Sequence, residues 1–170
     1  MKHKVGIGIF CGILLVTGFF VSCKKSEEGA KAAGTTPIAD LIKAGKSPVA
    51  VGSMFRGINP VAPTFSMALV NISDCPIQSV TGTVLYFDKD GKLLPEGKVE
   101  SSYGELSPIK PGEKIELSII AKDENAVSGK WIIKEVVYLK QNPLDKNYPP
   151  LPYKWTNPNY ETELGAAENR

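Results

Sequence analysis

The sequence VTGTVLYFDKDGKLL, residues 80–94, contains the best-defined turn signal of the chain and predicts a β-hairpin. Its first arm, up to Phe87, is apolar and rich in β-branched and aromatic residues, which favour strands. Asp90-Gly91 then lies in a polar turn, and this dipeptide is a strong hairpin signal because glycine adopts the positive φ that the turn needs. Leu93-Leu94 begins the returning strand.

The acidic residues of this turn indicate a calcium site as the alternative to a plain hairpin. Asp88 and Asp90 have the alternating spacing of calcium loops. Further oxygens elsewhere in the chain belong to Asp123, Glu124 and Asn125. Lys92 and Leu94, however, stand where an EF-hand loop would need ligands. We therefore predict a plain hairpin, with no metal ion and no cofactor.

Short strands continue on both sides of the hairpin, between Ser47 and Lys140. Apolar residues alternate with polar or small ones in three runs: Phe65, Met67 and Leu69; Ile115, Leu117 and Ile119; and Trp131, Ile133, Val137 and Leu139, where Glu135 breaks the alternation. Such alternation is typical of half-buried strands. Together with the glycines and prolines between the runs, it predicts an all-β fold, an immunoglobulin-like antiparallel β-sandwich of roughly 100 residues.

Four segments of this region form a set of strand and turn motifs: Val70-Asn71-Ile72-Ser73, Val84-Leu85-Tyr86-Phe87-Asp88, Asp90-Gly91-Lys92, and Leu106 to Glu113 with Pro111-Gly112-Glu113. Together they resemble the FxLYD-type domain, a small immunoglobulin-like sandwich common in bacterial envelope lipoproteins. The resemblance covers residues 64–139. It implies a fold and an envelope location, and it implies no catalytic residues.

A short helix is expected before the sandwich, at residues 37–44. Thr36-Pro37 resembles an N-cap followed by proline at the first helical position, and Gly45 stands where a helix would end. Ile38, Leu41 and Ile42 share one face of such a helix, which we expect to pack on the domain edge. We assign residues 36–141 to the sandwich with this leading helix.

Residues 142–170 form a C-terminal segment with five of the thirteen prolines. Proline at this density favours extended, polyproline-like chain over helix or central strand. The aromatic residues of the segment are Tyr148, Tyr153, Trp155 and Tyr160. Either the segment packs back over an edge or an end of the sandwich, or these aromatics form a ligand or partner surface. Glu161 to Arg170 are expected to be frayed.

Residues 1–22 predict an export signal, because the cationic Met1-Lys2-His3-Lys4 precedes an uncharged apolar run from Val5 to Val21. The run ends in Phe20-Val21-Ser22-Cys23, which resembles the lipobox of bacterial lipoproteins. The resemblance implies cleavage between Ser22 and Cys23 and a lipid on the Cys23 thiol. The alternative is an uncleaved signal anchor in which Cys23 keeps a free thiol.

Residues 23–35 are then expected to be a lipidated, flexible tether, because they are rich in Lys, Glu, Gly and Ala and lack apolar periodicity. Lys24, rather than an aspartate, follows the cysteine. By resemblance to known sorting rules, this favours an outer or surface membrane over the inner membrane.

Cleavage also changes the chemistry that the mature chain can have. It removes Lys2, Lys4 and His3, which leaves 18 of the 20 basic residues against 18 acidic ones, and no histidine. A net charge of zero gives no sign of the basic surface that a nucleic-acid partner needs. Without histidine, Ser-His-Asp catalysis, Cys-His catalysis and the usual zinc sites are excluded.

Cys75 is the one unmodified cysteine of the mature chain, because Cys11 leaves with the signal and Cys23 carries the lipid. No intrachain disulfide is then available, so stability has to come from the core. Cys75 is either a tolerated free thiol or the site of an intermolecular disulfide.

These features favour a monomeric, non-enzymatic binding or envelope-assembly module, tethered to a membrane, with a protein or glycan partner. The enzymatic alternative is a wall-glycan hydrolase with two carboxylates, for which the chain offers Glu96, Glu100 and Glu105. A third alternative is a purely structural spacer.

Overall fold

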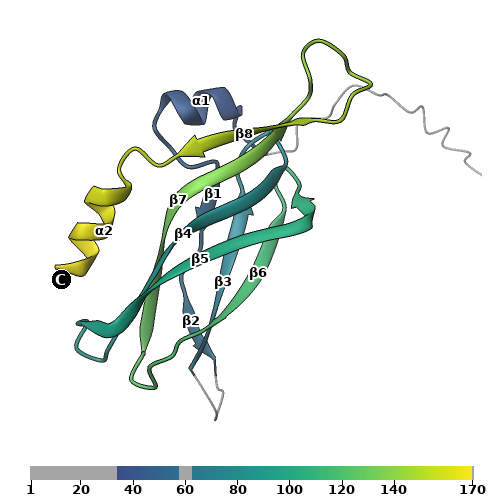
Figure 1. Cartoon of the computed structure of the whole chain (residues 1–170). Coiled ribbons are helices and arrows are strands. Elements are labelled where there is room, and N and C mark those ends of the chain that lie inside the picture. Colours follow the sequence, from purple (N-terminus) through teal and green to yellow (C-terminus); the bar gives the residue numbers. More distant parts are fainter. Residues whose placement is uncertain (1–33, 58–62, 170) are drawn as a thin grey trace, which may run out of the picture. The chain divides into compact units, whose positions relative to one another are not determined.

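Two antiparallel sheets make up the fold (Figure 1). The computed structural model describes residues 34–57 and 63–169, so the signal segment, Cys23 and most of the tether lie outside the described residues. In the first sheet, β3 (Thr64–Asn71) pairs with β1 (Val49–Val51), β2 (Phe55–Gly57) and β6 (Lys114–Ile120). The second sheet has the order β5 (Leu93–Ile109), β4 (Ile77–Phe87), β7 (Ser128–Lys140), β8 (Leu151–Thr156). The predicted all-β antiparallel sandwich is confirmed.

The core lies between the two sheets and follows the predicted alternation on β3. Phe65, Met67 and Leu69 are buried in it. Val84 and Tyr86 of β4 join them from the second sheet, and the rings of Phe65 and Tyr86 have their centres 5.2 Å apart. Burying one such side chain contributes about 1.5–3 kcal/mol. The core therefore supplies the stability that a disulfide supplies in many small domains.

The hairpin predicted at residues 80–94 is confirmed. β4 and β5 pair in it, and Gly91 has the positive φ, +78°, that the turn requires. Asp88 closes the turn, because its Oδ1 accepts the backbone N–H groups of Asp90 and Lys92, both at 2.9 Å. The Asp88 carboxylate is thus used by the turn itself. Among the described residues, no three His, Cys, Asp or Glu side chains are grouped so as to hold a metal ion.

Strand β7 departs from the predicted alternation in its second half. The residues buried there are one position earlier than predicted: Val136 and Tyr138 in place of Val137 and Leu139. The cause is a β-bulge, since Lys134 is an extra residue between the pairs Gly82–Ile133 and Thr81–Glu135. One extra residue moves every later side chain to the other face of the sheet.

Helix α1 (Ile38–Lys43) precedes the first strand, within the predicted range 37–44. Ile38 and Leu41 are buried, whereas Ile42, expected on the same face, is exposed. Thr36 does not cap this helix, because it forms a β-bridge with the connection between β3 and β4. Asp74 in that connection accepts the Ile38 N–H at 2.8 Å instead. A cap from a distant segment cannot be predicted from the residues next to the helix.

The C-terminal segment packs on the sandwich, which is the first of its two predicted alternatives. β8 pairs with β7, and Trp155 is buried there opposite Val136. The prediction that Glu161 to Arg170 are frayed is wrong, because helix α2 (Tyr160–Glu168) covers most of this range. Proline does not prevent this helix, since the last proline, Pro158, precedes it.

Helix α2 covers part of the outer face of the second sheet. Its buried residues follow the i, i+4, i+7 spacing of one helix face: Tyr160, Leu164 and Ala167. They pack in a second apolar cluster with side chains from β4 and β7, namely Leu85, Phe87 and Ile132. Neither helix in the described part of the chain is long and apolar enough to cross a bilayer.

Gly82 allows close pairing at the β7 bulge. A methyl group at Gly82 would lie 2.1 Å from the Ile132 carbonyl oxygen and 2.8 Å from the Trp131 indole nitrogen. We therefore expect Gly82→Ala to lower the free energy of unfolding by about 3 kcal/mol, as over-packing does. Gly165→Ala in α2, where a methyl group meets nothing within 4 Å, should raise it by about 0.5–1 kcal/mol. Urea denaturation measures both, and equal stability of the two variants would refute this role of Gly82.

Candidate binding surfaces

The two ends of the sandwich carry different surfaces. At one, which we call the entry end, the Thr36 N–H donates to the Ile72 carbonyl at 2.8 Å, so the described chain begins beside the β3–β4 connection. The β7–β8 loop, residues 141–150, lies at the same end, because the Leu139 N–H donates to Pro76 in that connection at 2.8 Å. The opposite end, which we call the far end, carries the β4–β5 and β6–β7 turns (Figure 1).

The four aromatic residues considered as a partner surface are divided by the structure. Tyr148 and Tyr153 are exposed, and Tyr153 stacks on Tyr138 with ring centres 5.8 Å apart. Trp155 is buried in the core between the sheets, and Tyr160 is buried in the α2 cluster. Tyr148 and Tyr153 are therefore the two of the four that a partner can reach.

The β7–β8 loop holds its shape with its own polar side chains. Gln141 Nε2 donates to the carbonyl oxygens of Lys146 at 2.9 Å and Tyr148 at 3.2 Å. Asn142 accepts the Leu144 N–H at 2.9 Å, and Asp145 accepts the N–H two residues further on at 2.8 Å. In this setting Leu144 is 93% exposed and Tyr148 is 62% exposed.

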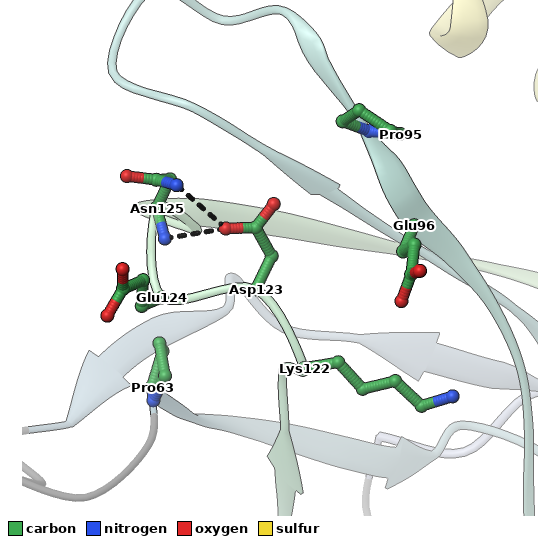
Figure 2. A pocket seen from close by; sticks show the side chains of 7 residues that line it. All are labelled: Pro63, Pro95, Glu96, Lys122, Asp123, Glu124 and Asn125. Atoms are coloured by element: carbon green, nitrogen blue, oxygen red, sulfur yellow. Dashed lines mark hydrogen bonds between the residues drawn. The ribbon is translucent and has the colours of Figure 1, made fainter.

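Two open cavities adjoin each other at the far end. The first has a volume of about 550 Å³ and is drawn in Figure 2; it is lined by Pro63, Pro95, Glu96, Lys122, Asp123, Glu124 and Asn125. The second has a volume of about 420 Å³; it shares Glu124 and Asn125 with the first and adds Arg56, Asp88, Lys89, Leu94 and Val127. Both sheets contribute, so the sandwich itself positions the lining.

Charges of both signs line these cavities, and part of the set holds the turn after β6 in place. Asp123 Oδ1 accepts the backbone N–H of Asn125 at 2.8 Å and its side-chain amide at 3.0 Å (Figure 2). Arg56 Nη2 donates to the Glu124 carbonyl at 3.4 Å. None of the lining residues is a serine, threonine, cysteine or histidine. The lining therefore offers charged and amide groups for polar contacts.

The acids considered for glycan hydrolysis lie on different surfaces. Glu96 lines the first cavity. Glu100 pairs with Thr83 across β4 and β5, and its Oε1 accepts the Thr83 hydroxyl at 3.0 Å on the outer face of the second sheet. Tyr160 of α2 reaches the same hydroxyl at 2.5 Å. The side chain of Glu105 lies outside the described part. Glu96 and Glu100 therefore do not face a common groove.

Two large apolar side chains near the far end face solvent on the outer face of the first sheet. Phe55 of β2 is 70% exposed and Ile120 of β6 is 65% exposed. They pair with Ser66 and Thr64 of β3, so they flank the start of β3 on one face. We call these two residues the Phe55 patch.

This patch was not predicted from the sequence. β2 has three residues, which is too short to show an alternation. The pair Ile119-Ile120 did carry a signal, because consecutive apolar residues at a strand end cannot both face the core.

Cys75 lies partly buried in the β3–β4 connection. Burial raises the pKa of its thiol to about 11, and the charge of the neighbouring Asp74 adds to the rise. Asn71 Nδ2 and the Ser73 hydroxyl donate to the Cys75 carbonyl at 2.8 and 3.0 Å, so the backbone here is held by buried polar side chains. These two hydrogen bonds stabilise the backbone of the β3–β4 connection and do not involve the Cys75 thiol.

Comparisons with known proteins support the fold alone. No family model and no curated protein matches the chain. A hypothetical protein from Peptoclostridium difficile 630 is similar in structure, with a TM-score of 0.53 and 13% identity over 74% of this chain and 93% of that chain. A DUF1425 family member from Shewanella sp. pv-4 has a TM-score of 0.39 and 14% identity over 51% of this chain and 76% of that chain, and this likeness is too distant to carry an argument.

We predict that Cys75 in the folded protein reacts slowly with thiol reagents. A thiol pKa of about 11 instead of 9.0 lowers the thiolate fraction at pH 8 by about 100-fold, and the thiolate is the reactive form. Alkylation by iodoacetamide should therefore be slow at pH 8 and should rise up to pH 11. Mass spectrometry of the Cys75 peptide measures the rate, with the urea-unfolded chain as control. Equal rates in the folded and unfolded chains at pH 8 would contradict this prediction.

Proposed function

We propose that this chain is a lipid-anchored lipoprotein of the bacterial cell envelope, whose FxLYD-type domain is a non-enzymatic module that binds a protein partner at its far end. One observation carries the binding part of the proposal. The far end combines the exposed Phe55 patch with two adjoining cavities of mixed charge, at the end of the sandwich opposite to the one where the chain enters.

The anchor is supported by the sequence at the signal junction. A cationic start, an apolar run and the small residue Ser22 before Cys23 fit a lipoprotein signal. Two or three acyl chains at one cysteine hold a protein firmly, because each buried methylene contributes about 0.8 kcal/mol. Lys24 after the cysteine favours an outer or surface membrane.

The chemistry of the far end favours a protein as the partner. Protein interfaces combine an apolar centre, often aromatic, with a polar rim. Phe55 supplies such a centre on the outer face of the first sheet, and Arg56, whose side chain leaves β2 on the opposite face, lines the second cavity. A partner that covers the far end would contact both. Opposite charges close together, such as Lys89 and Asp88, match a mixed protein surface better than the uniform charge of a nucleic acid.

The anchor predicts the mass of the mature protein. Detergent extracts of membranes are expected to contain a chain that begins at Cys23 and carries acyl chains on that residue. Cys23→Ala should show neither the cleavage nor the lipid. Intact mass spectrometry of both proteins decides, and a wild-type chain that starts at an unmodified Met1 would refute the anchor.

The Phe55 patch predicts which substitution abolishes partner binding. Truncating a central aromatic residue of an interface costs about 2 kcal/mol or more, so Phe55→Ser should weaken binding at least about tenfold. Ile42→Ser is the matched control, because it removes an exposed apolar side chain on α1. The measurement is the yield of cross-linked adducts recovered from cells that express each variant. Recovery of the same partner in equal amounts with Phe55→Ser would sink the proposal.

A further inference from the structure

We propose that the β7–β8 loop is a second membrane contact, in which Leu144 and Tyr148 enter the headgroup region of the bilayer that holds the lipid anchor. This inference rests on the proposed anchor at Cys23 and assigns a role to the entry end, which the binding function of the far end leaves unused.

The first observation is the exposure of apolar side chains in this part of the chain. Of the eight large hydrophobic residues that are exposed among the described residues, four fall between positions 144 and 153: Leu144, Tyr148, Leu151 and Tyr153. Leu144 is nearly fully exposed, although Gln141 donates, and Asn142 and Asp145 accept, the hydrogen bonds that hold the loop around it. A loop held in this way presents Leu144 to its surroundings without first having to be ordered.

The second observation is the position of the loop relative to the anchor. The described chain begins at the entry end, and the loop extends from the same end (Figure 1). From Cys23 to Gly34 the covalent chain spans at most roughly 40 Å, even when fully extended. The lipid therefore keeps the entry end, with Leu144 and Tyr148, close to the bilayer surface.

The third observation is the chemistry of the loop. Tyrosine is enriched at membrane interfaces because its ring is apolar and its hydroxyl is polar. Lys140 and Lys146 lie on either side of Leu144 in the chain and are both exposed. Phosphate headgroups attract such cations. The one acid in the loop, Asp145, already accepts the Asn147 N–H at 2.8 Å.

Because the lipid and the tether already hold the protein at the membrane, a weak contact between the loop and the bilayer is sufficient. Two side chains bind a bilayer only weakly on their own, as even a single myristoyl chain gives marginal, reversible binding. A short linker, however, turns the second contact into an intramolecular one at an effective concentration of roughly millimolar. The loop is therefore expected to occupy the bilayer surface in the anchored protein and to add little to binding without the anchor.

Fluorescence of a probe at position 144 tests the contact in the complete lipoprotein. Leu144→Cys in a Cys75→Ser background is labelled with an environment-sensitive dye and reconstituted into vesicles of phosphatidylethanolamine and phosphatidylglycerol. We expect blue-shifted emission and about twofold quenching by lipids spin-labelled near the headgroup, because interfacial side chains lie ~5–10 Å inside that boundary. Phe55→Cys with the same dye is the control, since that residue is also exposed but lies near the far end, and it should stay unquenched.

Each other outcome counts against the proposal in a distinguishable way. If the protein floats with the vesicles but the probe at position 144 stays solvent-like and unquenched, the loop contact is wrong and the anchor stands. If the unlabelled protein does not float and Cys23 carries no lipid, the anchor fails and this inference fails with it. If the probe becomes shielded without vesicles as the protein concentration rises, the loop binds a second copy of the chain rather than lipid.

Discussion

The second half of strand β4, residues 82–87, is buried on both faces, and the rest of the structure depends on that double burial. Val84 and Tyr86 point into the core between the sheets, whereas Leu85 and Phe87 point the other way, into the cluster under α2. A strand with two apolar faces needs a layer on each side. The first sheet supplies one layer and α2 supplies the other. The helix is therefore part of the fold, and it covers the outer face of the second sheet over Leu85, Phe87 and Ile132.

The packing of α2 on the second sheet also involves polar side chains. The polar side chains between β4, β5 and α2 pair with one another: Thr83 bonds to Tyr160 and Glu100, and Lys98 pairs with Glu168 at 2.7 Å. In the described part of the chain no helix covers the outer face of the first sheet, and there Phe55 and Ile120 are exposed. In the proposed anchored protein, the entry end is the one joined to the tether, and the apolar loop there is proposed to serve a different contact from the mixed-charge surface at the far end.

The sequence predicted the features that are set locally and missed those that depend on distant parts of the chain. The Asp90-Gly91 turn and the alternation on β3 were predicted correctly, since a turn and a period of two are properties of neighbouring residues. The shift on β7 was not, because the bulge at Lys134 arises from pairing with Gly82, about fifty positions earlier. Helix α2 was missed because its apolar stripe has only three residues. These residues stabilise the helix only when they pack on β4 and β7. For the same reason, Tyr148 and Tyr160 looked alike in the sequence although only Tyr148 is exposed.

Trp131 shows how this sandwich keeps a packed centre without a disulfide. In immunoglobulin domains a buried tryptophan packs against the bridge between the sheets. Here the Trp131 indole occupies the space that a side chain at Gly82 would fill, and Cys75 lies in the β3–β4 connection. The Trp131 N–H is buried without a hydrogen-bond partner among the described residues, which costs about 1–3 kcal/mol. Burying the ring removes roughly 200 Å² from water, worth about 5 kcal/mol. The burial of the Trp131 ring therefore outweighs the lost hydrogen bond. A larger residue at position 82 would displace the ring and lose that free energy.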